Sequence, residues 1–364
     1  MTRDEIVAAI RAAHAGRTPL RLRGAGSKDF YGGLLAGEVL DLSGHRGIVA
    51  YEPTELYLTA KCGTPLAEIE ATLAEHGQML AFEPPHFSAN LTVDRDISAK
   101  TGATLGGCLA AGLAGPRRMQ AGAVRDFVLG VTLVDGRGQV LDFGGRVMKN
   151  VAGYDVSRLI AGSLGTLGAI AEATLKVLPK PVAETTLAFA CAADEAVRRL
   201  NDWGAQPLPL SAAFWHDGRL LLRLSGAAAA VDAARRRLGG ELTVDAEKTW
   251  ISVREQTHPA FAATPLWRVA LPSTAPALAV DGLAAIEWGG ALRWYAGDID
   301  AATIRAAATA AGGHATLYRA PESLRCRVDP FTPLAPALLA LHRRLKKVFD
   351  PAGILNPGRL YAEF

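Results

Sequence analysis

The spacing of apolar residues predicts alternating helices and strands in the first part of the chain. Apolar residues recur on one helical face over residues 3–15. A second helix follows Thr64, which we take as its N-cap, with Pro65 at the first position and Gly77 at the stop. Shorter apolar runs predict strands at 19–23, 39–42, 48–51 and 56–62.

The segment 101–180 continues this alternation and adds many glycines. Residues 101–116 predict a packed loop that leads into a helix, and 135–138 predict a hairpin turn. The other elements expected here are strands at 124–134, 139–143 and 169–178, a helix at 156–160 and a loop at 162–168.

The composition changes at Pro179-Lys180-Pro181, after which glycine-rich loops become rare. Helices are predicted at 193–203, 227–238 and 300–311, strands at 220–224, 267–271, 291–295 and 315–318, and a last helix at 334–349. We therefore expect an α+β protein with an antiparallel sheet in its middle part. The expected divisions are 1–180, 181–330 and 331–364.

Charge and cysteine content exclude several classes of protein. The 39 basic and 36 acidic residues give a net charge of +3, without the basic run that a nucleic-acid-binding protein needs. No stretch is apolar enough for a membrane span, and charges interrupt the N-terminus too early for a signal peptide. We expect a cytoplasmic protein, at most peripheral to the inner membrane through partners. Dispersed cysteines, and histidines without a ligand spacing, predict no metal site.

Three glycine-rich segments are the main candidates for binding chemistry: Gly24–Lys28, Thr104–Gly115 and Gly162–Ile170. Glycine allows main-chain N–H groups to approach a ligand closely, and successive N–H groups form an anion-binding concavity. The first segment matches neither a Rossmann fingerprint nor a Walker A loop. Together, the three segments suit an elongated dinucleotide that lies between two subdomains. The alternative is that small residues only permit close packing of helices against a sheet.

The same residues carry a resemblance to a known family. The segments concerned are Arg23–Ser27, Ala103–Gly107, Gly115–Gly130, Val147–Asp155, Gly162–Gly168 and Phe349–Gly358. They resemble the FAD-binding proteins of the vanillyl-alcohol oxidase (PCMH-type) fold and, more narrowly, the FAD-binding E subunits of bacterial glycolate oxidase (glycolate dehydrogenase). The resemblance implies an FAD-binding domain over 1–180, a cap domain on the substrate side over 181–330, and a C-terminal segment that returns to the first domain.

The resemblance also implies which residues contact FAD. They are Arg23, Gly24, Ala25, Gly26, Ser27, Lys28, Thr104, Gly106, Gly107, Gly112, Gly165, Gly168, Ile170 and Asn356. The first loop would bind the pyrophosphate, and Asn356 would lie near the flavin ring. Many relatives have Glu where Leu164 stands, so one polar contact is missing here. Relatives with covalent flavin have His near the first loop, where this chain has Ser27 and Lys28, and we predict non-covalent FAD.

The candidate catalytic residues are His86, Arg268 and Arg293. A histidine suits the base that takes the hydroxyl proton of a 2-hydroxy acid, and an arginine suits its carboxylate. For His86 the alternative is a loop histidine bonded to backbone, and for each arginine it is stacking on a neighbouring indole. Lys149 is a further cation that would neutralise reduced flavin or a phosphate, or form a surface salt bridge.

The predicted function is an FAD-binding subunit of a glycolate oxidase complex. The resemblance implies oxidation of glycolate or a related 2-hydroxy acid, with a related FAD subunit and an iron–sulfur subunit as partners. Two alternatives stay open: a stand-alone FAD-dependent D-2-hydroxy-acid dehydrogenase, and a non-catalytic assembly subunit that contains FAD.

Overall fold

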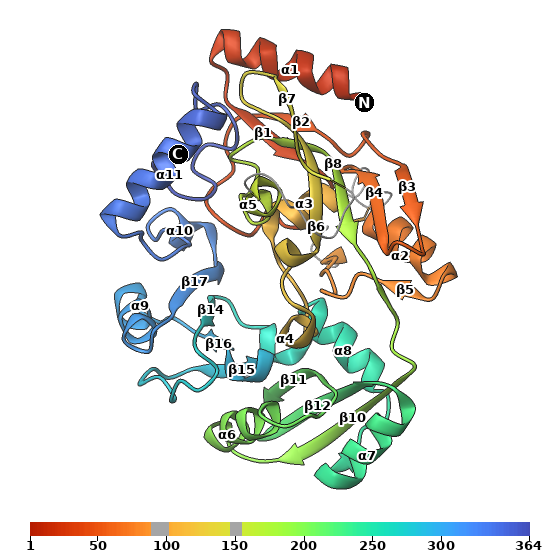
Figure 1. The fold of residues 1–364 in the computed structure, drawn as a ribbon. Helices are drawn as coiled ribbons and strands as arrows, with labels where there is room; N and C mark the ends of the chain where they lie inside the picture. The colour runs from red at the N-terminus through yellow and green to blue at the C-terminus, as the bar shows by residue number, and fades with distance from the viewer. Residues whose placement is uncertain (89–101, 146–154) are drawn as a thin grey trace.

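The N-terminal part of the chain is built around a five-stranded antiparallel sheet (Figure 1). The computed structural model describes residues 1–88, 102–145 and 155–364. In spatial order the strands are β3 (Ile48–Glu52), β4 (Tyr57–Lys61), β8 (Ala169–Lys176), β6 (Val128–Val134) and β7 (Val140–Gly144). A short parallel pair, β1 (Leu20–Arg23) and β2 (Glu38–Asp41), stands apart from this sheet. The strand β1 leads directly into the first glycine-rich segment.

Short helices accompany these strands. They are α1 (Arg3–Gly16), α2 (Leu66–Glu75), α3 (Leu105–Ala111), α4 (Arg118–Ala121) and α5 (Val156–Ile160). Thr2 and Glu5 form a capping box that fixes the start of α1. Thr104 caps α3, because its hydroxyl accepts a hydrogen bond from Gly107 N. Since α3 packs against β4 and β8, the second glycine-rich segment lies over the five-stranded sheet.

The middle of the chain forms a second sheet, of eight antiparallel strands, which with its helices we call the cap. Its strands in spatial order are β13 (Glu241–Leu242), β10 (Ala183–Ala190), β12 (Arg219–Gly226), β11 (Leu210–His216), β15 (Leu283–Glu287), β16 (Leu292–Ala296), β14 (Leu266–Ala270) and β17 (His314–Arg319). Its helices are α6 (Ala193–Gly204), α7 (Ala228–Leu238), α8 (Ala246–Arg254) and α9 (Ala301–Ala310). The cap fills the lower half of Figure 1.

The chain crosses once into the cap and returns from it. The two-residue strand β5 (Gln78–Met79) pairs with β9 (Leu178–Pro179), directly before β10 begins. After the cap, α10 (Glu322–Arg325) and α11 (Pro336–Phe349) lead back to the N-terminal part, as the blue ribbon in Figure 1 shows. Leu20 N donates to Ile354 O at 2.7 Å, and Asn356 N donates to Leu20 O at 2.9 Å. The C-terminal segment thus lies against β1.

The structure differs from two details of the sequence prediction. Residues 124–127 form a 3₁₀ turn rather than the start of a strand, because the Asp126 carboxylate accepts a hydrogen bond from Ala123 N at 2.8 Å. Thr64 does not cap α2, since its hydroxyl accepts from Gly47 N at 2.8 Å, and Pro65 takes the N-cap position. Among the described residues, no helix combines the length and apolar character that crossing a bilayer requires.

Candidate functional site

One cleft joins all three glycine-rich segments. It contains about 850 Å³ of space that protein atoms do not occupy, counting its opening to solvent. Thirteen of the fourteen residues predicted to contact the cofactor line it: Arg23, Gly24, Ala25, Gly26, Ser27, Lys28, Thr104, Gly106, Gly107, Gly165, Gly168, Ile170 and Asn356. Residues that lie far apart in the sequence therefore meet around one space.

Gly112 is the predicted residue that does not line this cleft. It ends α3 in the left-handed conformation, with φ 65°, and its N–H donates to Cys108 O at 3.0 Å. A Cβ at this position would lie 3.0 Å from Gly162 Cα. Helix termination and close backbone approach account for this glycine.

The first loop presents main-chain donors to the cleft. Among hydrogen bonds between described residues, the N–H groups of Ala25, Gly26, Ser27 and Lys28 reach no protein acceptor. Gly26 has φ 79°, which favours glycine at this position. The loop closes through Asp29, whose N–H donates to Gly26 O at 3.0 Å. Successive N–H groups of this kind suit a phosphate.

Glycines in the other two segments serve packing as well. A Cβ at Gly106 would lie 2.8 Å from Cys62 Cβ, and a Cβ at Gly168 would lie 2.6 Å from Leu133 Cγ. Both positions therefore exclude any larger residue. These two glycines therefore permit close packing, as the alternative interpretation of the sequence proposed. They also line the cleft on which the three segments converge.

Asn356 holds two walls of the cleft together. Its Oδ1 accepts a hydrogen bond from Leu22 N at 2.7 Å, and its Nδ2 donates to Leu164 O at 2.7 Å. A Cβ at Gly165 would lie only 2.6 Å from this Nδ2. The amide thus joins β1 to the third glycine-rich segment. A role near the flavin ring stays a prediction.

Sequence analysis missed two groups that shape the first loop. The Asp29 carboxylate binds both Arg21 and Arg23, the latter at 3.1 Å from Nε to Oδ2. Arg359 lies deeper and donates to main-chain carbonyls, including Tyr31 O at 2.5 Å. Burial lowers the pKa of Arg359 to about 10. The two arginines of Arg21-Leu22-Arg23, close in sequence to Asp29, could have indicated the ion pairs of this loop. No local pattern indicates the role of Arg359.

His86 lies outside the cleft. Its Nε2 is 3.1 Å from Glu70 Oε2, and its main-chain N–H donates to the Glu255 carboxylate at 3.1 Å. Glu255, at the end of α8, also accepts from Phe87 N at 2.6 Å. A cap residue therefore fixes this loop. The catalytic role of His86 stays a prediction.

Arg268 lies in a smaller pocket between the cap and the N-terminal part. Its guanidinium is 5.1 Å from the centre of the Trp288 ring. Arg268 therefore stacks on an indole, which was the alternative to a catalytic role. Glu287 and Tyr318 line the same pocket. Burial raises the pKa of Glu287 to about 7, although the Trp294 N–H donates to its carboxylate at 2.7 Å.

Arg293 is buried and lies apart from both spaces, beside a groove next to α6. Its guanidinium donates to the main-chain carbonyls of Pro276 at 2.5 Å and Gly290 at 3.4 Å, and also to Ala275 O. These contacts hold the segment 275–290 against β16. Lys149 falls within 146–154, outside the described residues.

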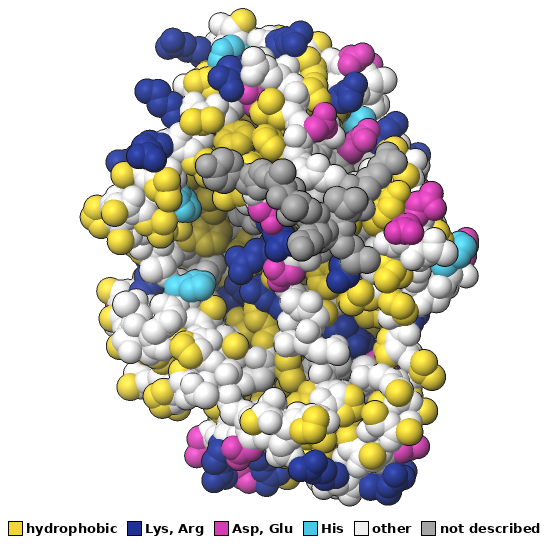
Figure 2. All heavy atoms as spheres, viewed as in Figure 1, with side chains coloured by type: hydrophobic (Ala, Val, Ile, Leu, Met, Phe, Trp, Pro, Cys, Tyr) yellow, Lys and Arg dark blue, Asp and Glu magenta, His cyan; other side chains and the backbone are white. Residues whose placement is uncertain are grey.

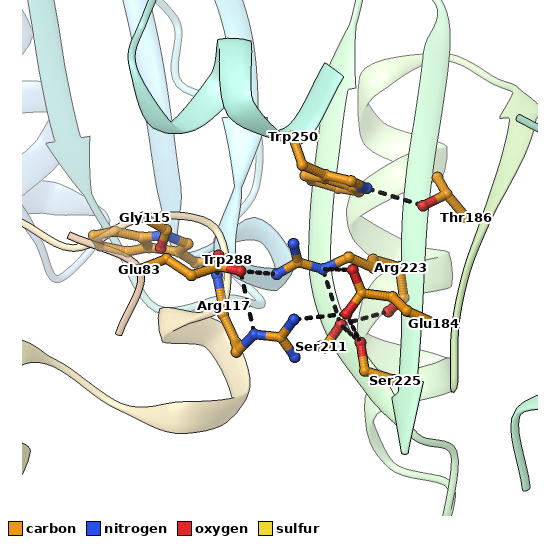
Figure 3. Close-up of polar contacts among 10 residues, drawn as sticks. All are labelled: Glu83, Gly115, Arg117, Glu184, Thr186, Ser211, Arg223, Ser225, Trp250 and Trp288. Carbon is orange, nitrogen blue, oxygen red and sulfur yellow. Dashed lines mark hydrogen bonds and ion pairs between the residues drawn. The ribbon is translucent and has the colours of Figure 1, made fainter. Parts of the chain in front are cut away.

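Figure 2 shows a hollow in the middle of the displayed face, where Lys and Arg side chains gather above the cap. Four charged residues join the two parts of the molecule (Figure 3). Glu83 Oε1 lies 3.2 Å from Arg117 Nε and 2.8 Å from Arg223 Nη2. Arg117 Nη2 in turn lies 2.6 Å from Glu184 Oε2. Because both arginines are buried, this network ties α4 and its preceding loop to β10 and β12.

Comparison with known proteins identifies the class of protein. The family model for the FAD binding domain matches residues 1–144, and the model for the C-terminal domain of FAD linked oxidases matches residues 333–360. The glycolate oxidase subunit GlcE of Escherichia coli K12 is 46% identical over 355 residues, which cover 97% of this chain and 96% of that protein. The chain belongs to the family of this glycolate oxidase subunit, and its cofactor is FAD.

Other matches are more distant in sequence. The glycolate oxidase subunit GlcD of Bacillus subtilis is 32% identical over 187 residues, which cover 50% of this chain and 37% of that protein. The solved structure of alkyldihydroxyacetonephosphate synthase superposes with a TM-score of 0.62 at 16% identity, over 97% of this chain and 74% of that one. Together with the match to the FAD binding domain, this likeness confirms the expected PCMH-type α+β fold.

Proposed function

We propose that this chain is the FAD-binding subunit of a glycolate oxidase complex that oxidises glycolate or a related 2-hydroxy acid. The convergence of three glycine-rich segments on one cleft is the observation that carries the proposal. The match to GlcE along nearly the whole chain supports the substrate class.

The residues of the cleft fit FAD. The N–H groups of residues 25–28 would hold phosphate oxygens, and Gly26 leaves room for that approach. Asn356 would keep β1 and the third segment at a fixed spacing, so that both contact one ligand. FAD, when bound, supplies the hydride acceptor that oxidation of a hydroxy acid requires.

We further propose that FAD is bound without a covalent bond. The first loop offers Ser27 and Lys28 where covalent relatives have histidine. Leu164 is buried in the third segment and adds an apolar wall to the cleft. Acid precipitation of the protein is expected to release its flavin into solution.

Electrons would leave through partner subunits. Three of the four cysteines, Cys62, Cys108 and Cys191, are buried, and no group of three or more Cys, His, Asp or Glu side chains among the described residues could hold a metal ion. We therefore propose a related FAD subunit and an iron–sulfur subunit as partners. We also propose a cytoplasmic location, with contact to the inner membrane only through partners.

Flavin absorbance during turnover tests the proposal. Glycolate is expected to bleach the flavin of this chain only when the partner subunits are present. Bleaching of the isolated chain by glycolate or D-lactate would instead indicate a stand-alone dehydrogenase. A flavin that stays oxidised while the complete complex turns over would indicate an assembly subunit.

A further inference from the structure

Among the described residues, Lys28 has no carboxylate or carbonyl partner, unlike the other cationic side chains of the cleft. Four cationic side chains line the cleft. Arg21 and Arg23 share Asp29, and Arg359 donates to main-chain carbonyls. The Lys28 Nζ lies 3.3 Å from Ser27 Oγ, and no carboxylate of a described residue lies within 4.0 Å of it.

An aromatic ring flanks this ammonium group. Its Nζ lies 5.3 Å from the centre of the Phe87 ring, a distance typical of a cation–π contact. Burial lowers the pKa of Lys28, and the negative charge of Glu255 opposes that effect only in part. Since a buried charge is costly unless it is paired, the site favours an anionic ligand near Nζ.

The position of Phe87 shows which side of the loop Lys28 faces. Phe87 lines the pocket between the cap and the N-terminal part, together with Arg268 and Trp288. Glu255 of the cap fixes its main chain. The ammonium therefore lies on the cap side of the loop, whereas the diphosphate is expected at the free N–H groups. A redox ring that takes a hydride from substrate must lie where substrate can reach it, and the pocket between the cap and the N-terminal part is such a place.

We propose that the Lys28 ammonium neutralises the negative charge that the flavin ring gains on reduction, and that it thereby raises the midpoint potential of bound FAD. This inference rests on the proposed function. Oxidation of the hydroxy acid gives the 2-oxo acid, a hydride passes to FAD, and the hydroxyl proton passes to solvent. The reduced cofactor then carries one additional negative charge, which a protonated Lys28 would neutralise.

The test compares Lys28→Met with wild type, with Lys28→Arg as the rescue variant. Lys180→Met, which removes an exposed lysine elsewhere, is the matched control. FAD binding is measured by absorbance, the midpoint potential by dithionite titration against a reference dye, and anion stabilisation by the dissociation constant of the sulfite adduct. For Lys28→Met we expect bound FAD, a sulfite adduct at least tenfold weaker, and a midpoint potential lower by about 30 mV, which corresponds to tenfold for two electrons. Lys28→Arg and Lys180→Met are expected to resemble wild type.

Two results would overturn the inference. In one, Lys28→Met keeps the wild-type potential and sulfite affinity. In the other, it loses affinity for FAD and ADP equally while the remaining flavin keeps its potential, which would assign Lys28 to the diphosphate. If Lys28→Met does not fold by circular dichroism, Lys28→Gln provides the same comparison. Failure of the wild-type chain to bind FAD would instead refute the proposed function.

Discussion

Lys346 and Asp350 form a buried ion pair one turn apart at the end of α11, with 2.7 Å between Nζ and Oδ2. The same Nζ donates to Thr166 O at 2.8 Å and to Leu355 O at 2.9 Å. The Asp350 carboxylate accepts from Leu355 N at 2.7 Å. The pair therefore folds the turn after α11 and connects it to the third glycine-rich segment.

Asp350→Asn is expected to destabilise the protein strongly. It removes the only carboxylate paired with Lys346 among the described residues, and a buried charge without its partner costs about 3–5 kcal/mol. Urea denaturation followed by circular dichroism measures the change. Glu363→Gln, which alters the exposed pair with Arg343, is the control and is expected to change the free energy of unfolding by less than about 1 kcal/mol. Equal stability of the two variants would contradict this account of α11.

Glu83→Gln is expected to weaken the attachment of the cap. The substitution leaves Arg117 and Arg223 buried with Glu184 as their remaining carboxylate, and we expect a loss of about 3 kcal/mol, on the scale of broken buried pairs. A double-mutant cycle with Arg223→Met measures the coupling directly. Glu241→Gln, in a surface pair on the same sheet, is the control. An absence of coupling between Glu83 and Arg223 would mean that apolar packing alone holds the cap.

Glu287 predicts a pH dependence of stability. Its pKa is about 7 in the folded protein and near the ordinary 4.5 when unfolded, so between these values the folded state binds more protons. The free energy of unfolding therefore falls as pH rises from about 4.5 to 7, on the order of 3 kcal/mol for this group alone. Denaturation at pH 5 and pH 8 is expected to show a smaller decrease for Glu287→Gln than for wild type. If the free energy of unfolding decreased equally for wild type and Glu287→Gln, the result would contradict a buried, protonated Glu287.

Gly26→Asp is expected to abolish FAD binding. It places a carboxylate in the loop where phosphate is expected, at a backbone position with φ 79°. Gly77→Asp is the control for an aspartate at a positive φ, because Gly77 has φ 63°, no atom within 4 Å of an added Cβ and no place in the cleft. Absorbance at 450 nm after FAD reconstitution measures binding. If both variants retain flavin, the first loop does not hold the phosphates.

The sequence allowed the elements and the convergence of the loops to be predicted, because local periodicity and glycine spacing carry that information. Within the cap, the strands β10, β11, β13 and β15 and the helix α8 were not predicted, since their apolar faces are set by contacts within the cap. The role of Glu255 depends on residues far away in the sequence, His86 and Phe87. The role of Asp350 depends on Lys346 and on the buried carbonyls that Lys346 also contacts. No local sequence pattern encodes either role. Asn356 shows the same limit: its position was predicted, but its bonds to Leu22 and Leu164 required the fold.

The flavin content of the purified chain tests the central claim most directly. The claim is that the three glycine-rich segments together bind a single FAD. Titration of flavin-depleted protein with FAD, followed by absorbance and calorimetry, is expected to saturate at one FAD per chain, and acid is expected to release the flavin intact. A folded chain that stays colourless and takes up no added FAD would contradict the account.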